Sequence, residues 1–309
     1  MRTSTTALIA SLFAGLVSSP AHAEVEVVTS IKPLQLIVSA IQNGAGETRV
    51  LLPPGASPHS FSLRPSDLRA LRSADLVYWI GPDLETFLQP ALEGRTGRTV
   101  PVQDMEGLRI RHFGELTTGG MDEHAEEEDH DDLHRPGSID AHLWLNPGNA
   151  RVIASGVTAD LIQLDPTEAA RYKANLAAFN ERLDKEDARL KSRLEAVKNR
   201  PFFVFHQAFD YFEDAYGLNH RGVLAIGTEV QPGARHVAEM RSRLQATGPV
   251  CLFNEPPVRP RLAETLSQGL PVRFAELDAL GFDIQPGPDG YTKLIGKLGD
   301  DLASCLEAL

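Results

Sequence analysis

The stretch PTEAARYKANLAAFNERLDKEDARLKSRLEAVK, residues 166–198, contains no glycine and no proline beyond Pro166. Its apolar residues recur at steps of three, four or seven positions, which places them on one stripe of an α-helix. The stripe comprises Tyr172, Leu176, Phe179, Leu183, Leu190, Leu194 and Val197. At about 1.5 Å per residue, the helix would extend for about 50 Å, the length of a two-domain protein. We therefore expect one long, rigid linker helix at residues 165–199 that joins two domains.

A coiled-coil dimer is the alternative use for such a helix. Acidic residues at Glu186 and Asp187 interrupt the apolar stripe, whereas a coiled coil needs a sustained apolar seam. The sequence therefore favours a linker helix, in a protein that we expect to be a monomer.

Short apolar runs alternate with helical patterns on both sides of this helix, which is typical of parallel α/β units. The runs expected to form strands are residues 25–29, 49–52, 76–80, 202–205, 250–253 and 272–274, and the expected helices include 34–42, 65–73, 234–245 and 260–268. The predicted fold class is α/β, with two lobes that each hold a mainly parallel sheet flanked by helices. We expect the N-terminal lobe at residues 24–164 and the C-terminal lobe at residues 200–309.

The first 23 residues have the pattern of a secretory signal peptide. Arg2 supplies a positive start, residues 7–17 form an apolar run too short to span a bilayer, and Ala21-His22-Ala23 is a cleavage motif. A buried N-terminal helix is the alternative, but Ser18-Ser19-Pro20 breaks the run. We expect cleavage after Ala23 and a mature, soluble protein that is exported.

Cysteine usage agrees with export. Cys251 and Cys305 are the only cysteines, and a pair of cysteines in an exported chain is most simply one disulfide, with two free thiols as the alternative. Such a bridge would attach the last helix to a strand of the C-terminal lobe. Because no cysteine lies near the signal, we expect no lipid anchor on an N-terminal cysteine.

Negative charge is concentrated in DEHAEEEDHDDLH, residues 122–134, which holds eight carboxylates, three histidines and no basic residue. Such a run cannot enter a packed core, because its carboxylates would lose hydration without gaining cations. Imidazoles among carboxylates favour binding of transition-metal ions. We expect an acidic loop at residues 115–138, with His124, His130 and His134 as an accessory metal site; an acidic linker without a binding role is the alternative.

The net charge of the whole chain also favours binding of cations. Loss of the signal removes one arginine and no acidic residue, so a formal net charge of −12 becomes −13. A chain this acidic is a poor candidate for binding nucleic acid and is suited to binding cations.

Four residues follow expected strands or the acidic loop. His59 lies in a Pro/Gly loop after residues 49–52, His206 ends FFVFH, Asp278 follows VRFAEL, and His142 follows the acidic loop in DAHLWLNP. Ligands bind beyond the carboxyl ends of strands in open α/β sheets. Each residue alone has a structural explanation, and Asp278 could be a turn or capping residue. Together, three imidazoles and one carboxylate suit Zn²⁺ in a cleft between the lobes.

Several motifs then resemble a known family. PGASPHSFSLRPSDLRAL, DLVYWIGPDLETFL, HLWLNP, FFVFHQAFDYFEDAYGL, EVQPGARHVAEMR, FNEPPVRP and LDALG are similar to the periplasmic zinc-binding proteins of ABC importers (ZnuA type, cluster A-I). The similarity covers essentially the whole mature chain, with the motifs in the same order.

This resemblance implies two α/β lobes, one long helix and zinc between the lobes. It carries the zinc-ligand role onto His59, His142 and His206, and it matches Asp278 to an aspartate that completes the site in many members. It also matches the Cys251–Cys305 disulfide. Some zinc-binding members have a glutamate directly before the first histidine, where this chain has Pro58. Asp278 or a water is then left for the fourth position, and we expect Asp278.

The function implied is a zinc carrier that delivers Zn²⁺ to an inner-membrane permease driven by a cytoplasmic ATPase. A periplasmic zinc chaperone is a further candidate partner. The rival from another class is a zinc hydrolase with Glu255 as general base. A manganese carrier is a second alternative, although manganese-binding relatives have a carboxylate at the position of His206. Nothing in the spacing of His112, His220 and His236 indicates a shared site, and we expect structural roles for them.

Overall fold

The computed structural model describes residues 24–114, 136–224, 233–256 and 261–309. The expected signal peptide lies outside this part of the chain, as do His124, His130 and His134 and most of the acidic loop. In the described residues, no helix is both long enough and apolar enough to cross a bilayer. These residues form two parallel sheets flanked by helices, so the predicted α/β fold class is confirmed.

The N-terminal sheet has four parallel strands in the order β2 (Thr48–Val50), β1 (Val27–Thr29), β3 (Leu76–Trp79) and β4 (Arg98–Pro101). The two central strands are buried along their whole length, because helices cover both faces of a parallel sheet. The sequence prediction missed β4. Its residues RTVP contain one large apolar side chain and lie at the sheet edge, where burial no longer demands a hydrophobic run.

Four helices accompany this sheet. They are α1 (Lys32–Gln42), α2 (Pro65–Ser73), α3 (Gln89–Leu92) and α4 (Pro147–Leu164), with short 3-10 turns at Val102–Asp104 and Leu143–Leu145. The α4 helix has a strong start, because Asn146 accepts hydrogen bonds from the backbone of Gly148 and Asn149 and is followed by Pro147. This fixed start is only four residues from His142.

The C-terminal sheet has three parallel strands in the order β5 (Phe202–Val204), β6 (Val250–Asn254) and β7 (Val272–Glu276). Its helices are α6 (Asp210–Tyr216), α7 (Ala234–Thr247), α8 (Arg261–Ser267) and α9 (Gly290–Glu307). Cys251 on β6 forms a disulfide with Cys305 on α9, as predicted, and so attaches the last helix to the central strand.

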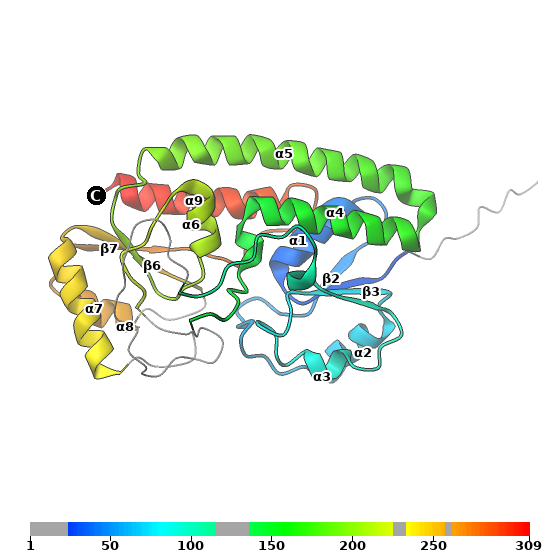
Figure 1. Ribbon diagram of the computed structural model, residues 1–309, viewed down its shortest axis with the longest axis horizontal. Coiled ribbons are helices and arrows are strands. Elements are labelled where there is room, and N and C mark those ends of the chain that lie inside the picture. The colour runs from blue at the N-terminus through cyan, green and yellow to red at the C-terminus, as the bar shows by residue number, and fades with distance from the viewer. Residues whose placement is uncertain (1–23, 115–135, 225–232, 257–260) are drawn as a thin grey trace, which may run out of the picture.

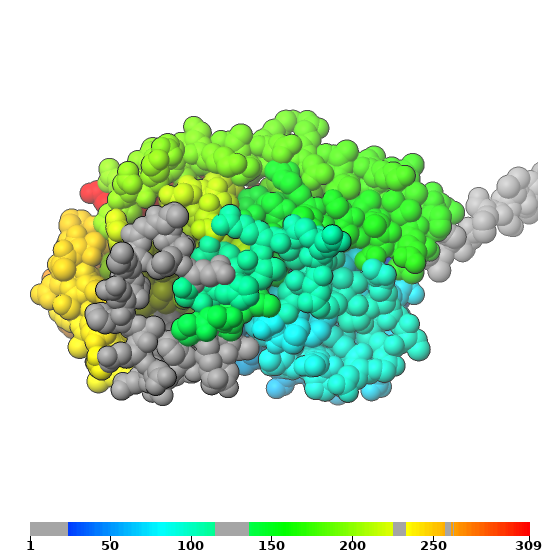
Figure 2. All heavy atoms as spheres, in the orientation of Figure 1, coloured from blue at the N-terminus to red at the C-terminus, as the bar shows by residue number. Residues whose placement is uncertain are grey.

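The long helix is α5 (Ala169–Glu195), which is preceded by a 3-10 turn at Pro166–Glu168. Of its predicted stripe, Leu176 is half-buried and the other six side chains are buried. Figure 1 shows α5 passing over α4 at one end and over α9 at the other, and Figure 2 shows it covering both lobes along one side. Because its apolar stripe is buried inside its own chain, α5 acts as the predicted linker helix and not as a coiled coil.

One large hydrophobic core extends across both lobes, and each lobe has a smaller core of its own. Helix α1 of the N-terminal lobe packs against α9 of the C-terminal lobe, and a Cβ on Gly290 would lie only 2.9 Å from Leu36. Trp144 Nε1 donates to Ala279 O at 2.9 Å, and the Tyr291 hydroxyl donates to Trp144 O at 2.7 Å. A shared, close-packed core resists rigid rotation of one lobe against the other.

Candidate metal centre

Three histidines from separate parts of the chain meet at the junction of the lobes. His59 lies in the loop between β2 and α2, His142 directly precedes the turn that leads into α4, and His206 lies two residues after β5. One ring nitrogen of each lies within 4.8 Å of a ring nitrogen of the other two. His142 and His206 are 3% and 2% exposed, so water reaches them poorly.

The spacing of the three rings matches tetrahedral coordination. Their centroids are 5.6 Å apart for His59 and His142, 5.5 Å for His59 and His206, and 5.0 Å for His142 and His206. A zinc ion bonded at about 2.0–2.1 Å would lie about 3.2 Å from each centroid, and a tetrahedral angle then separates the centroids by about 5.2 Å. The donor set is therefore already near the geometry that a zinc ion needs.

His142 is held by a carboxylate two residues earlier. Asp140 Oδ1 lies 2.8 Å from His142 Nδ1 and also accepts the His142 backbone N–H at 3.0 Å. Because a carboxylate accepts the proton on Nδ1, the lone pair of the neutral ring is on Nε2. Asp140 is 1% exposed, and its burial raises the pKa of the carboxyl to about 7, although the His142 amide and Arg111 lower it.

His206 is held in the same way by Glu255, which directly follows β6. Glu255 Oε1 lies 2.9 Å from His206 Nδ1, so Nε2 is again the nitrogen left to face a cation. The sequence analysis named Glu255 only as the general base of a hydrolase. Its contact with the imidazole instead gives it the position of an orienting partner.

Burial and charge push the two histidines in opposite directions. Burial lowers the pKa of His142 well below its usual value, and the charge of His206 lowers it further. Burial alone would lower the pKa of His206 too, but the charge and hydrogen bond of Glu255, with the charges of Asp140 and Asp210, raise it above its usual value. The carboxylates around His206 therefore favour a positive charge at this ring, which a proton or a bound cation can supply.

Asp278 lies beyond β7, as expected, but its carboxylate stabilises a turn by accepting backbone hydrogen bonds. Oδ1 accepts the backbone N–H groups of Leu280 and Gly281 at 3.0 and 2.8 Å, and Oδ2 accepts that of Phe282 at 2.7 Å. Among the described residues, the group of mutually close ligand atoms around His59 does not include Asp278. The turn role that the sequence allowed is thus present, and the ligand role stays a prediction.

The remaining described histidines have local partners. His220 Nδ1 lies 2.8 Å from Glu213 and 3.9 Å from Asp210, which forms a second close group of ligand-type atoms that the sequence spacing did not reveal. His236 Nε2 lies 3.1 Å from Leu224 O, and His112 pairs with Ile139 in an antiparallel bridge. His220 and His236 are thus hydrogen-bonded within the chain, to Glu213 and to Leu224 O.

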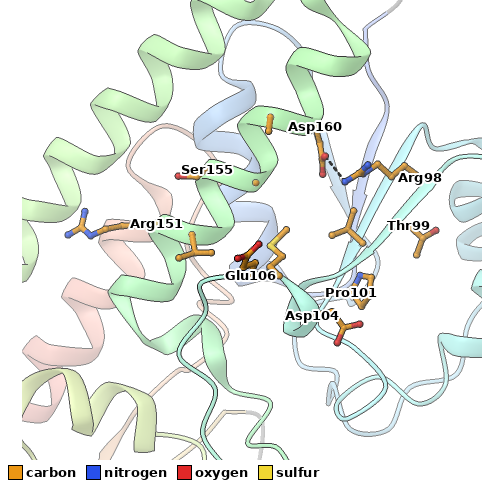
Figure 3. Close-up of a pocket in the computed structure, with 13 residues that line it drawn as sticks. Arg98, Thr99, Pro101, Asp104, Glu106, Arg151, Ser155 and Asp160 are labelled. Atoms are coloured by element: carbon orange, nitrogen blue, oxygen red, sulfur yellow. Dashed lines mark ion pairs between the residues drawn. The ribbon is translucent and has the colours of Figure 1, made fainter.

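A separate hollow of about 820 Å³ lies between β4 and α4, away from the three histidines. Figure 3 shows Arg98 reaching the Asp160 carboxylate across it, at 2.8 Å. Its described lining includes Asp104, Glu106 and Arg151 but no histidine or cysteine. The imidazole cluster and not this hollow has the chemistry of a metal centre.

Two α/β lobes joined by a long helix, with three imidazoles at their junction, define a two-lobe binding protein that has the donor set of a metal site. The chain belongs to the ZnuA family, the zinc-uptake complex component A periplasmic, whose model matches residues 27–305. This membership confirms the predicted role in zinc uptake and the predicted periplasmic location, and it places the chain among transport components and not enzymes.

Individual relatives support the same assignment. The high-affinity zinc uptake system protein ZnuA of Brucella abortus (strain 2308) is 34% identical, with 97% of each chain covered. The protein of the same description from Yersinia pestis is 35% identical over 92% of each chain. A crystal structure of ZnuA shares the fold, with a TM-score of 0.75 at 21% identity over 92% of this chain and 100% of that one.

Proposed function

We propose that His59, His142 and His206 bind Zn²⁺ through one ring nitrogen each and that the protein delivers this ion to an inner-membrane permease driven by a cytoplasmic ATPase. The observation that carries the proposal is the convergence of three ring nitrogens within 4.8 Å, each from a different segment of the fold. Three imidazoles that meet at a lobe junction form the donor set that suits zinc.

The outer carboxylates support a divalent ion. Asp140 and Glu255 bond to the far side of His142 and His206, so two carboxylates support the cluster of imidazoles. A Zn²⁺ ion would neutralise this pair, which a monovalent ion could not do. A nitrogen donor at His206 also favours Zn²⁺ over Mn²⁺, which prefers oxygen ligands.

Asp278 is our candidate for the fourth position. Its two oxygens accept three backbone N–H groups, and a carboxylate offers about four lone-pair directions, so one direction is left for a cation. A water is the alternative. If Asp278 is a ligand, Asp278→Asn should weaken zinc binding without moving the fold; unchanged affinity would assign the position to water.

Release to the permease would require only a small opening. The lobes share a core through α1 and α9, so the loops that carry His206 and Asp278 are better placed to move than the lobes are. We further propose that the acidic loop at residues 115–138 binds zinc more weakly through His124, His130 and His134 and captures ions for the centre. The protein would act as a monomer, and a periplasmic zinc chaperone is a candidate donor of the ion.

The test is an equilibrium titration of the metal-free protein with Zn²⁺ against a chelator of known affinity. Replacing His59, His142 or His206 by alanine should each weaken tight binding by more than the roughly 10- to 100-fold typical of outer partners. His236→Ala is the matched control, because its ring bonds to Leu224 O. Unchanged affinity in any of the three variants, or a preference for Mn²⁺ over Zn²⁺ at equal concentration, would overturn the proposal.

A hydrolytic role would show a different signature. Zinc-loaded protein that hydrolyses ester or peptide substrates, with the activity abolished in His206→Ala, would favour an enzyme. Family membership and the engagement of Glu255 by His206 both argue for transport without turnover.

A further inference from the structure

Arg111 contacts both the segment that holds His142 and the helix that follows His206, and these two histidines come from opposite lobes. Its carbonyl oxygen accepts the backbone N–H of Asp140 at 2.9 Å, and its own N–H donates to the Tyr211 hydroxyl at 2.8 Å. Asp140 orients His142, and Tyr211 lies in α6, whose first residue is four positions after His206. The main chain of Arg111 thus bonds to the segment behind His142 and to the helix behind His206, which places the Arg111 side chain between them.

The guanidinium strengthens the same connection. Arg111 lies 3.8 Å from Asp210 and pairs closely with Asp214, both on α6. Among the described residues, it is the only Lys or Arg that is buried, at 5% exposure. Burial alone would lower the pKa of this guanidinium, but Asp214, Asp210 and Asp140 raise it.

Removal of this charge would take the guanidinium away from Asp210 and leave Asp214 with the exposed Arg109. Asp140, Asp210 and Glu213 are 1%, 6% and 1% exposed, and Asp214 is half-buried beside them. A buried carboxylate that loses its cation is costly, so the acids on α6 would move away from one another and from Asp140. This movement shifts α6 relative to the Asp140 segment, and with them the two imidazoles.

We propose that Arg111 is a positioning residue that fixes the separation of His142 and His206 and so sets the zinc affinity of the centre. This inference rests on the proposed ligand roles of the two histidines. Arg111 acts indirectly, through the Asp140 segment on one side and through α6 on the other. Outer partners of this kind typically change metal affinity by about 10- to 100-fold.

The test compares Arg111→Met with Arg109→Met. Arg109 is the matched control, because it also pairs with Asp214, at 2.9 Å, but its side chain is 62% exposed. Chelator competition with Zn²⁺ should show at least about tenfold weaker binding for Arg111→Met and less than about threefold for Arg109→Met.

A spectroscopic readout separates positioning from a general loss of stability. Co²⁺ loaded into folded wild type should show the intense visible absorption of a tetrahedral site, and Arg111→Met should shift or weaken it while Arg109→Met does not. If Arg111→Met does not fold, Arg111→Lys takes its place, because a single ammonium cannot reach Asp210 and Asp214 together as a guanidinium does.

The outcomes are distinct. Wild type that binds zinc through the three histidines, with unchanged affinity and Co²⁺ spectrum in the Arg111 variant, overturns this inference alone. Wild type whose zinc affinity does not depend on those histidines overturns the proposed function itself. Weaker binding with an altered Co²⁺ spectrum in the Arg111 variant supports both.

Discussion

The hydrogen bond from His206 to Glu255 gives a quantitative prediction for Glu255→Gln. Glu255 Oε1 lies 2.9 Å from Nδ1 of a ring that is 2% exposed. An ion on the far nitrogen would lie about 7 Å from this carboxylate, and at an effective dielectric constant of about 20 the attraction between charges of +2 and −1 is about 5 kcal/mol. This value is an upper limit, because glutamine keeps a neutral hydrogen bond and the surroundings relax.

We therefore expect Glu255→Gln to weaken zinc binding by about 10- to 100-fold, or about 1.4 to 2.7 kcal/mol, with little change in the fold. Chelator competition at fixed pH and ionic strength measures the change. Glu239→Gln is the control, because its carboxylate is exposed and pairs with Arg235 on α7. Equal zinc affinities for wild type and Glu255→Gln would refute the view that this carboxylate orients His206 and supplies negative charge to the centre.

Three further predictions concern other parts of the molecule. Burial raises the pKa of Glu85 from 4.5 to about 7, so its contribution to stability is full below about pH 4.5 and is lost as pH rises through about 7. The fall in unfolding free energy between pH 5 and pH 8 should therefore be smaller by about 3 kcal/mol in Glu85→Gln than in wild type. An identical fall in both proteins would contradict the raised pKa. Replacing Cys251 and Cys305 by serine removes a crosslink between residues 54 positions apart. Urea melts should show a loss of about 4 kcal/mol in unfolding free energy, and zinc affinity should be unchanged. Weaker zinc binding would show instead that the disulfide supports the centre. Deleting residues 117–134 should remove weak zinc equivalents in a titration and leave one tight site, and an unchanged stoichiometry would deny the acidic loop a binding role.

Much of the architecture was predictable because its signals are local. The stripe of α5 and the apolar runs of β1, β3, β5 and β6 follow from burial, which forces hydrophobic residues into a fixed period. The exposed edge strand β4 carries no such signal. The shared core was equally invisible, since the contact between Leu36 on α1 and Gly290 on α9 joins residues far apart in the sequence.

The candidate centre was predictable in part for the same reason. His59 and His206 follow strands of parallel sheets, and topology brings strand ends together. His142 does not follow a strand of either sheet. It is positioned by a short antiparallel pairing of residues 111–113 with residues 138–140. In the sequence, only the nearby acidic loop and the family resemblance indicated a role for it. Asp140 could have been noticed from its place two residues before His142.

Arg111 had no comparable signal in the sequence. It lies 29 positions before Asp140, and its role depends on α6, which the hydrophobic periodicity did not single out. No local sequence period constrains charged residues that act through tertiary contacts. Their roles are therefore seen in the fold and cannot be predicted from their spacing in the sequence.

The central claim is that three histidines from the two lobes hold one zinc ion at their junction. Anomalous diffraction at the zinc edge from crystals of the zinc-loaded protein tests it most directly. We predict one strong peak at about 2.0–2.1 Å from a ring nitrogen of each of His59, His142 and His206. A tightly bound ion whose peak lies beyond bonding distance of any one of these three rings would contradict the account.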